Sequence, residues 1–132
     1  MTEPTRKDAE LLIKLYSTMV AADMWEAFNW AMGLDELSYE EFAERCPLGS
    51  DGYNHFMKIG SYYELIGILV KYGTINEDMV LDYYYTLWDK LGPLVKGYQE
   101  AMGSPGWFEN YEYLGKKKAE WRKSHPPGYK MS

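Results

Sequence analysis

The stretch that decides the fold is residues 61–114, which read SYYELIGILVKYGTINEDMVLDYYYTLWDKLGPLVKGYQEAMGSPGWFENYEYL. Apolar residues that recur every three or four positions predict one buried helix face, made by Phe56, Ile59, Tyr63, Ile66 and Val70. Gly73 can adopt the positive φ that ends many helices, and Asn76 can cap the next one. The pattern therefore predicts a helical hairpin that turns near Gly73.

The second helix of this hairpin is predicted to end at Gly92-Pro93. Its apolar face would carry Val80, Tyr83, Tyr84, Leu87 and Leu91. Because proline can open a helix but not continue one, we expect a third helix over about residues 94–102. Gly103-Ser104-Pro105-Gly106 then predicts a break, after which apolar residues follow a helical period as far as Trp121.

Capping patterns predict the helices that come before this stretch. Thr5 can cap a first helix, and residues 5–33 fit either two helices or one helix that bends near residues 21–23. Ser38 with Glu41 forms a capping box for a short helix that Pro47 ends, and Ser50 or Asp51 can cap the central helix. Residues that favour strands are sparse and do not alternate. We predict an all-α, single-domain bundle of about six helices with no sheet over residues 1–124, and a Pro/Gly-containing C-terminal tail over residues 125–132.

Several of these residues resemble a known family pattern. The run comprises Tyr63-Glu64, Gly67, Leu69-Val70, Gly73, Ile75, Trp88, Leu91, Pro93 and Tyr111-Glu112-Tyr113-Leu114. It resembles the bacterial and archaeal domain-of-unknown-function family 4760, which implies an all-helical fold and no established activity. Members often carry a membrane segment before the domain, and none is visible in this sequence.

The resemblance indicates four candidate binding residues, and the chain departs from the family pattern at one place. The candidates are Glu64, Trp88, Tyr111 and Glu112. After Pro93, where the family pattern usually has an arginine, this chain has Tyr98-Gln99. Any ion pair that the arginine makes in the family would therefore need another arrangement here.

Length and composition indicate one folded domain. The chain has 132 residues, of which 46% are hydrophobic and 17% aromatic, so enough apolar surface is present for a core. Cys46 is the only cysteine and needs no oxidising compartment, which predicts a cytoplasmic location. No secretory signal is visible, and the longest strongly apolar run, residues 65–70, is too short to span a bilayer.

Charge is divided unevenly along the chain. Residues 1–115 contain 8 basic and 19 acidic side chains, a net charge of −11, whereas residues 116–132 contain 6 basic and 1 acidic, a net of +5. Nucleic acid could therefore bind only through the basic segment, whose relevant side chains are Lys116, Lys117, Lys118, Arg122 and Lys123.

The residues that common catalytic and metal sites require are missing from the sequence. Neither of the two histidines lies three residues after a glutamate, as a di-iron bundle would need. Asp51 and His55 lie one helix turn apart and are more simply explained as a capping or solvated pair than as metal ligands. Cys46 and His55 are separated by a loop, and we do not predict that they form a catalytic pair. No phosphate-binding loop and no nucleophile elbow are present. We therefore assign no catalytic, cofactor-binding or metal-binding residue.

Aromatic residues and two acids are the features that could carry binding. The chain has 13 tyrosines and 5 tryptophans, too many to be buried together at helical spacing, so some should be exposed. Glu64 and Glu112, if buried, need partners, for which Lys90, Lys96 and Lys116 are candidates. Gly60 and Gly67 predict close packing of the central helix against a neighbour.

Three functions remain open on the sequence alone. The first is a protein–protein interaction or self-association module, which includes a head-to-tail contact of the basic segment with the acidic stretch of residues 35–44. The second is a nucleic-acid-associated regulator that uses the basic segment. The third is a small-molecule sensor or enzyme with an aromatic and acidic pocket around Glu64 and Glu112.

Overall fold

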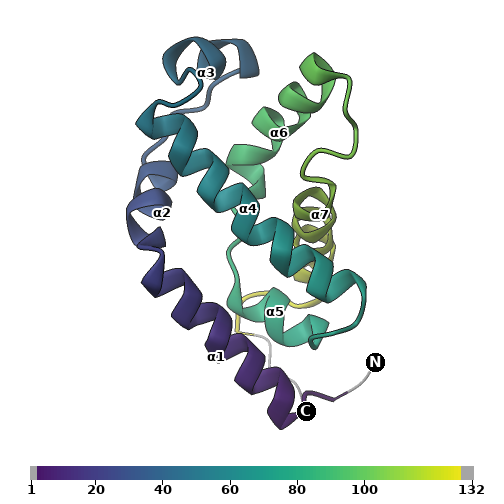
Figure 1. Cartoon of the computed structure of the whole chain (residues 1–132). Coiled ribbons are helices and arrows are strands. Elements are labelled where there is room, and N and C mark those ends of the chain that lie inside the picture. Colours follow the sequence, from purple (N-terminus) through teal and green to yellow (C-terminus); the bar gives the residue numbers. More distant parts are fainter. Residues whose placement is uncertain (1–2, 129–132) are drawn as a thin grey trace.

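The computed structural model describes residues 3–128, so residues 129–132 of the expected tail lie outside the described part of the chain. Its regular structure is entirely helical over these residues (Figure 1). The helices are α1 (Arg6–Ala21), α2 (Met24–Met32), α3 (Tyr39–Arg45), α4 (Asp51–Lys71), α5 (Glu77–Tyr83), α6 (Trp88–Met102) and α7 (Glu109–Ser124). The all-α prediction is confirmed, and the helix pattern of residues 5–33 resolves into two helices because Asp23 adopts a left-handed conformation with φ 53°.

Helix α4 is the centre of the fold. It crosses the molecule between α1 and α2 on one side and α6 and α7 on the other (Figure 1), and it packs against both α7 and α2. The predicted apolar stripe is buried along its whole length, from Phe56 to Val70. This face therefore supplies much of the core, as its periodicity predicts.

The local capping predictions are confirmed, and the structure decides between Ser50 and Asp51. Thr5 and Ser38 form complete capping boxes, and the side chain of Asn76 accepts a hydrogen bond from the backbone N–H of Met79 at 3.0 Å. Ser50 caps α4 by accepting from the N–H of Tyr53 at 3.3 Å. Each cap joins two residues that are three positions apart, so it depends on the local sequence and not on distant parts of the chain.

The prediction that Gly92-Pro93 ends a helix is wrong. Helix α5 ends at Tyr83, residues 84–87 form a linker, and α6 begins at Trp88 and continues through Pro93. Pro93 costs α6 one intrahelical hydrogen bond, to the carbonyl of Asp89, and the helix tolerates it. Leu87, with φ 58°, adopts a left-handed conformation whose strain is offset by the burial of its side chain.

Close packing of α4 against a neighbouring helix, predicted from Gly60 and Gly67, is confirmed, and the structure shows that the neighbour is α7. A Cβ atom at Gly60 would overlap the ring of Phe108, and one at Gly67 would overlap the backbone carbonyl of Asn110. Both neighbours lie at the start of α7. The glycines therefore set how closely α7 approaches α4.

Lysines from distant helices cap the C-terminal ends of α1, α2 and α5, none of which has a basic residue in its own last turn. The ammonium of Lys58 donates to the carbonyl of Ala22 at 3.1 Å, and that of Lys90 donates to the carbonyls of Met32 and Leu34 at 2.6 and 3.2 Å. Lys118 donates to the carbonyl of Leu81. Lys90 therefore binds the C-terminal end of α2. It pairs with neither Glu64 nor Glu112, for which it was a candidate partner.

Within residues 3–128, none of the helices combines the length and the apolar character that crossing a bilayer requires.

Candidate functional site

Tyrosine hydroxyls hold the backbone of the non-helical linker between α5 and α6. Tyr63 on α4 donates to the carbonyl of Tyr85 at 2.6 Å, and Tyr111 on α7 donates to the carbonyl of Thr86 at 2.6 Å. The hydroxyls of Tyr62 and Tyr84 lie 2.8 Å apart. We call residues 83–86 the tyrosine ridge. Its shape is fixed from beneath by two helices.

The hydroxyls that hold the ridge stay protonated at any physiological pH. Burial raises the pKa of Tyr63, Tyr84 and Tyr111 well above the ordinary value of tyrosine. Neighbouring tyrosines raise the pKa of each further. The three side chains therefore act as stable hydrogen-bonding groups and not as proton carriers.

Backbone donors of the linker point away from the tyrosines that hold it. In a planar trans peptide, the N–H of a residue points opposite to the carbonyl of the residue before it. Since the carbonyls of Tyr85 and Thr86 point at Tyr63 and Tyr111, the N–H groups of Thr86 and Leu87 point away from these two tyrosines, and no acceptor meets them among residues 3–128. Thr86 and Leu87 are only 5% and 2% exposed, so these N–H groups add little to the exposed surface of the ridge.

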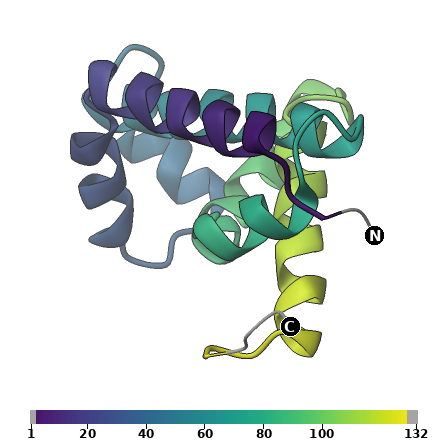
Figure 2. The same cartoon turned by 90° about the horizontal axis from the view of Figure 1, so that it is seen from below.

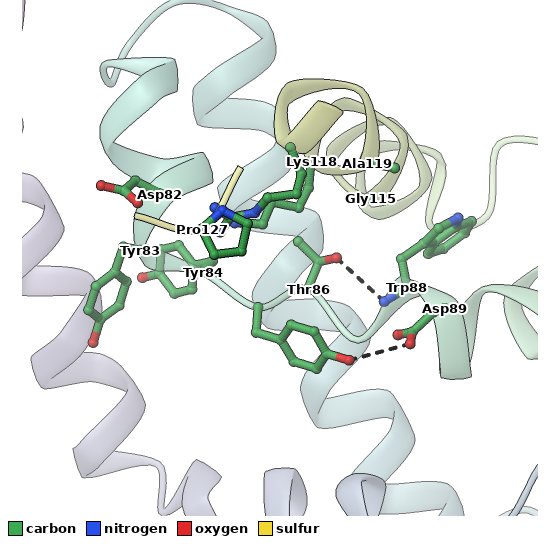
Figure 3. A pocket seen from close by; sticks show the side chains of 12 residues that line it. Asp82, Tyr83, Tyr84, Thr86, Trp88, Asp89, Gly115, Lys118, Ala119 and Pro127 are labelled. Carbon is green, nitrogen blue, oxygen red and sulfur yellow. Dashed lines mark hydrogen bonds between the residues drawn. The ribbon is translucent and has the colours of Figure 1, made fainter. Parts of the chain in front are cut away.

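One side of the ridge is a groove that we call the α7 groove. It has a volume of about 670 Å³ and lies between the ridge, the start of α6 and one face of α7 (Figure 3). Its walls include Tyr84, Trp88, Gly115, Lys118, Ala119 and Pro127. Trp88 packs edge-on against the ring of Tyr111, with centroids 5.0 Å apart, so α7 also fixes this wall.

Charges of both signs lie along the α7 groove. Asp82 and Asp89 come from α5 and α6, and Lys118 and Arg122 come from α7. The hydroxyl of Tyr85 donates to Asp89 at 3.3 Å (Figure 3), and burial lowers the pKa of Lys118. The groove is therefore mainly aromatic and apolar, with a few charged groups at its edges, as is common for binding sites.

The other side of the ridge is a smaller groove, which we call the α2 groove. It has a volume of about 360 Å³ and lies between α2, α4 and the ridge. Four large side chains around it are about half exposed: Trp25 (51%), Met32 (56%), Tyr83 (49%) and Tyr85 (57%). Tyr83 and Tyr85 border both grooves. The expectation that some aromatic residues are exposed is confirmed, and here they gather on one surface.

Glu64 caps the helix that holds the ridge. Its carboxylate accepts hydrogen bonds from the backbone N–H groups of Asn110 and Tyr111, both at 2.9 Å, and from the Asn110 side chain at 2.7 Å. Helix α7 has no side-chain cap from its own N-cap residue, Phe108. The carboxylate of Glu64, from a distant part of the chain, therefore caps α7. Glu64 pairs with none of the lysines that were its candidate partners.

Glu112 joins α6 to α7 through the lysines expected for it. Lys96 and Lys116 lie 3.1 and 2.6 Å from its carboxylate, which confirms those two pairings. Gln99 donates to the same carboxylate at 3.2 Å. Burial alone would raise the pKa of Glu112, but the hydrogen bonds from Lys116, Lys96 and Gln99 lower it to about 2. Gln99, which lies where this chain departs from the family pattern, thus contacts Glu112 through a neutral amide.

The four candidate residues belong to one support for the ridge and do not form a pocket of their own. Glu64 positions the start of α7, Tyr111 on α7 holds Thr86, Trp88 lines the α7 groove, and Glu112 ties α6 to α7. Neither glutamate lines the α7 groove or the α2 groove.

Sequence reasoning missed the exposed residues of the ridge as site residues. The repeated tyrosines at residues 83–85 are the available signal, but their spacing favours a helix face that includes Tyr83 and Tyr84.

The basic segment is largely engaged within the molecule. Lys116 pairs with Glu112 at 2.6 Å, Lys117 lies 3.8 Å from Glu77, and Lys123 lies 3.3 Å from Glu120. Arg122 stacks over Trp121, with its guanidinium carbon 5.2 Å from the ring centroid. Acids of α5 and α7 therefore offset much of the positive charge of this segment.

No group of three or more metal-ligating side chains comes together in the described residues. The ring of His55 packs on Trp30, with centroids 5.6 Å apart. His55 is therefore in contact with an aromatic side chain of α2.

The fold and the ridge define a small all-helical domain with an aromatic surface. Residues 4–118 match the family model described as Domain of unknown function (DUF4760), and the chain belongs to this family. Comparison with curated proteins and with solved structures gives no match.

Proposed function

We propose that the protein is an interaction module that binds an extended segment of a partner protein across the tyrosine ridge. The observation that carries this proposal is the gathering of Trp25, Met32, Tyr83 and Tyr85, each about half exposed, around two grooves. Scattered exposed apolar residues need no explanation, but a contiguous aromatic patch is typical of a binding surface.

The construction of the ridge supports this proposal. Aromatic side chains offer a large contact area at a low entropy cost, particularly where the backbone beneath them is already fixed. Buried hydroxyls of Tyr63 and Tyr111 fix the backbone of the ridge before any partner arrives.

A small-molecule sensor is the second candidate, because the α7 groove exceeds the roughly 300 Å³ at which ligand sites begin. This candidate no longer centres on Glu64 and Glu112, since both carboxylates are taken up by contacts within the fold. The nucleic-acid alternative has less support, because much of the basic segment is paired.

Head-to-tail self-association is a separate version of the interaction proposal. It predicts association that weakens with salt, since it joins the basic segment to the acidic stretch of residues 35–44. A monomeric mass by light scattering at both low and high salt would exclude this version. The cytoplasmic location likewise remains a prediction.

Site-specific photo-crosslinking tests the proposed surface. A photoreactive phenylalanine analogue is placed at residue 85 on the ridge or, as the matched control, at residue 72 after α4, where Tyr72 is 77% exposed. We expect a specific crosslinked partner from residue 85 and none from residue 72 in the cells that make the protein. The double variant Tyr83→Ser, Tyr85→Ser should lose the same partner in co-purification, whereas Tyr72→Ser should retain it. Equal crosslinking from both positions, or none from residue 85, would contradict the proposal.

A further inference from the structure

The chain turns sharply after α7. Helix α7 projects beyond the other helices, and the segment that follows it leaves the end of α7 to one side (Figure 2). The ring of His125 stacks on Trp121 with centroids 4.2 Å apart and an angle of 2° between the rings. Trp121 is itself anchored to Asp78 on α5, at 2.8 Å, and Arg122 donates to the carbonyl of His125 at 3.0 Å. The direction of this segment is therefore fixed by contacts at its root.

This segment places two prolines in two adjoining hollows. Pro127 lines the α7 groove together with Tyr84 and Lys118 (Figure 3). Pro126 lies in a smaller hollow of about 170 Å³ that shares Asp82 and Arg122 with the α7 groove. We call residues 125–128 the returning segment. It covers one end of the α7 groove and leaves the end at Thr86, Trp88 and Asp89 open.

Proline suits a groove of this kind for a physical reason. Consecutive prolines hold a chain in the extended polyproline conformation before it binds, so little entropy is lost on docking. Aromatic-lined grooves recognise such segments in several unrelated folds. In the α7 groove the walls include the aromatic side chains of Tyr84 and Trp88 and the small residues Gly115 and Ala119, with charged groups beside them.

We propose that the α7 groove is a docking site for an extended, proline-containing segment of a partner protein, and that the returning segment is its built-in competitor. This inference rests on the proposed interaction function and names its ligand class and its regulation. The ligand class is indicated by the chain itself, because Pro127 already packs against this groove as part of its wall. A partner that takes the position of Pro127 must displace the returning segment.

A titration with a short peptide tests the proposal on the full chain. The probe is the peptide Ser-His-Pro-Pro-Gly, the sequence of residues 124–128, with Ser-His-Ala-Ala-Gly as its control. Binding is followed by the amide NMR signals of Gly115 and Ala119. The double variant Pro126→Gly, Pro127→Gly weakens the returning segment. This variant should bind the probe about tenfold more tightly than the wild type, because a tethered competitor acts at a millimolar effective concentration against an affinity of about 0.1 mM.

Two further variants show whether the probe occupies the groove. In the double-variant background, Ala119→Trp fills the groove and should abolish saturable binding. Glu120→Trp changes the neighbouring exposed position, which borders a different hollow, and should leave binding unchanged. The Ala-Ala control peptide should bind at least about fivefold more weakly than the probe.

Each contrary result overturns a stated part. Absence of binding to the double variant, equal binding of both peptides, or binding that survives Ala119→Trp overturns the proline-docking site. Equal affinity of the wild type and the double variant overturns the competitor role. A partner that crosslinks at residue 85 while the peptide fails would leave the interaction function standing without this ligand class. Peptide binding without any partner crosslinked at residue 85 would support the proline-docking site and contradict the interaction function proposed for the ridge.

Discussion

The hydroxyl of Tyr111 donates to the backbone carbonyl of Thr86 at 2.6 Å and so joins α7 to the linker between α5 and α6. Both groups are buried. Together with the hydrogen bond from Tyr63 to the carbonyl of Tyr85, this contact fixes the backbone of the tyrosine ridge between its two grooves. A change in this contact should therefore affect both the stability of the protein and the shape of the proposed binding surface.

Tyr111→Phe should destabilise the protein by about 1–2 kcal/mol, because it leaves a buried carbonyl without its donor while it changes the packing little. Urea unfolding measures the effect. Tyr113→Phe is the control and should change the unfolding free energy by less than about 0.5 kcal/mol, since no hydrogen bond of its hydroxyl is seen within residues 3–128. Equal effects of the two variants would argue against a structural role for the Tyr111 hydroxyl.

Glu64→Gln should destabilise the protein by about 1–3 kcal/mol, because the amide loses the charge that meets the start of α7 and turns a donor toward the Asn110 side chain. Thermal and urea unfolding both report it. Glu100→Gln, at an exposed position on α6, should be neutral. A neutral Glu64→Gln would mean that α7 does not depend on this cap.

Gly67→Ala should destabilise by more than about 2 kcal/mol, although alanine favours an isolated helix over glycine by about 1 kcal/mol. The added methyl group would overlap the backbone of Asn110, which cannot move without shifting α7. Gly106→Ala, where an added Cβ meets nothing closer than 4.0 Å, is the matched control in chemical denaturation. Similar stability of the two variants would disprove the close contact of α4 with α7.

Acid should remove the contribution of Glu112. Its pKa is lowered from 4.5 to about 2 in the folded protein, so its contribution is fully present above pH 4.5 and is lost as the pH falls toward 2. Because Lys96 and Lys116 are largely exposed, we expect a contribution of only about 1 kcal/mol. The unfolding free energies of the wild type and Glu112→Gln should differ by this amount at pH 6 and converge near pH 2. A difference that is constant over this range would rule out the pairing as its cause.

The sequence predicted the helices wherever the determining contacts are local. Ser50 and Asn76 cap helices three residues away, and the stripe from Phe56 to Val70 repeats at the helical period. Such features form within one or two turns, so neighbouring residues alone establish them. The glycines of α4 likewise indicated a close neighbour, though not which one.

The same local reasoning failed in the segment from Tyr83 to Pro93. Its apolar spacing favoured a helix that continued to Gly92, whereas the chain leaves the helical conformation at Tyr84. The non-helical linker is stabilised by Tyr63 and Tyr111, which lie more than 20 residues away along the chain. Contacts of this kind outweigh local propensity, and no spacing rule reveals them.

The sequence by itself thus determined an all-helical fold, its local caps and its central buried face. Only the tertiary structure decided the partners of the charged residues, such as Glu64 at the start of α7 and Lys90 at the end of α2, and it alone created the tyrosine ridge and its grooves. The physical reason is the range of the interactions. Helix periodicity and capping depend on residues three or four apart, whereas a surface assembled from several helices depends on how those helices pack in three dimensions.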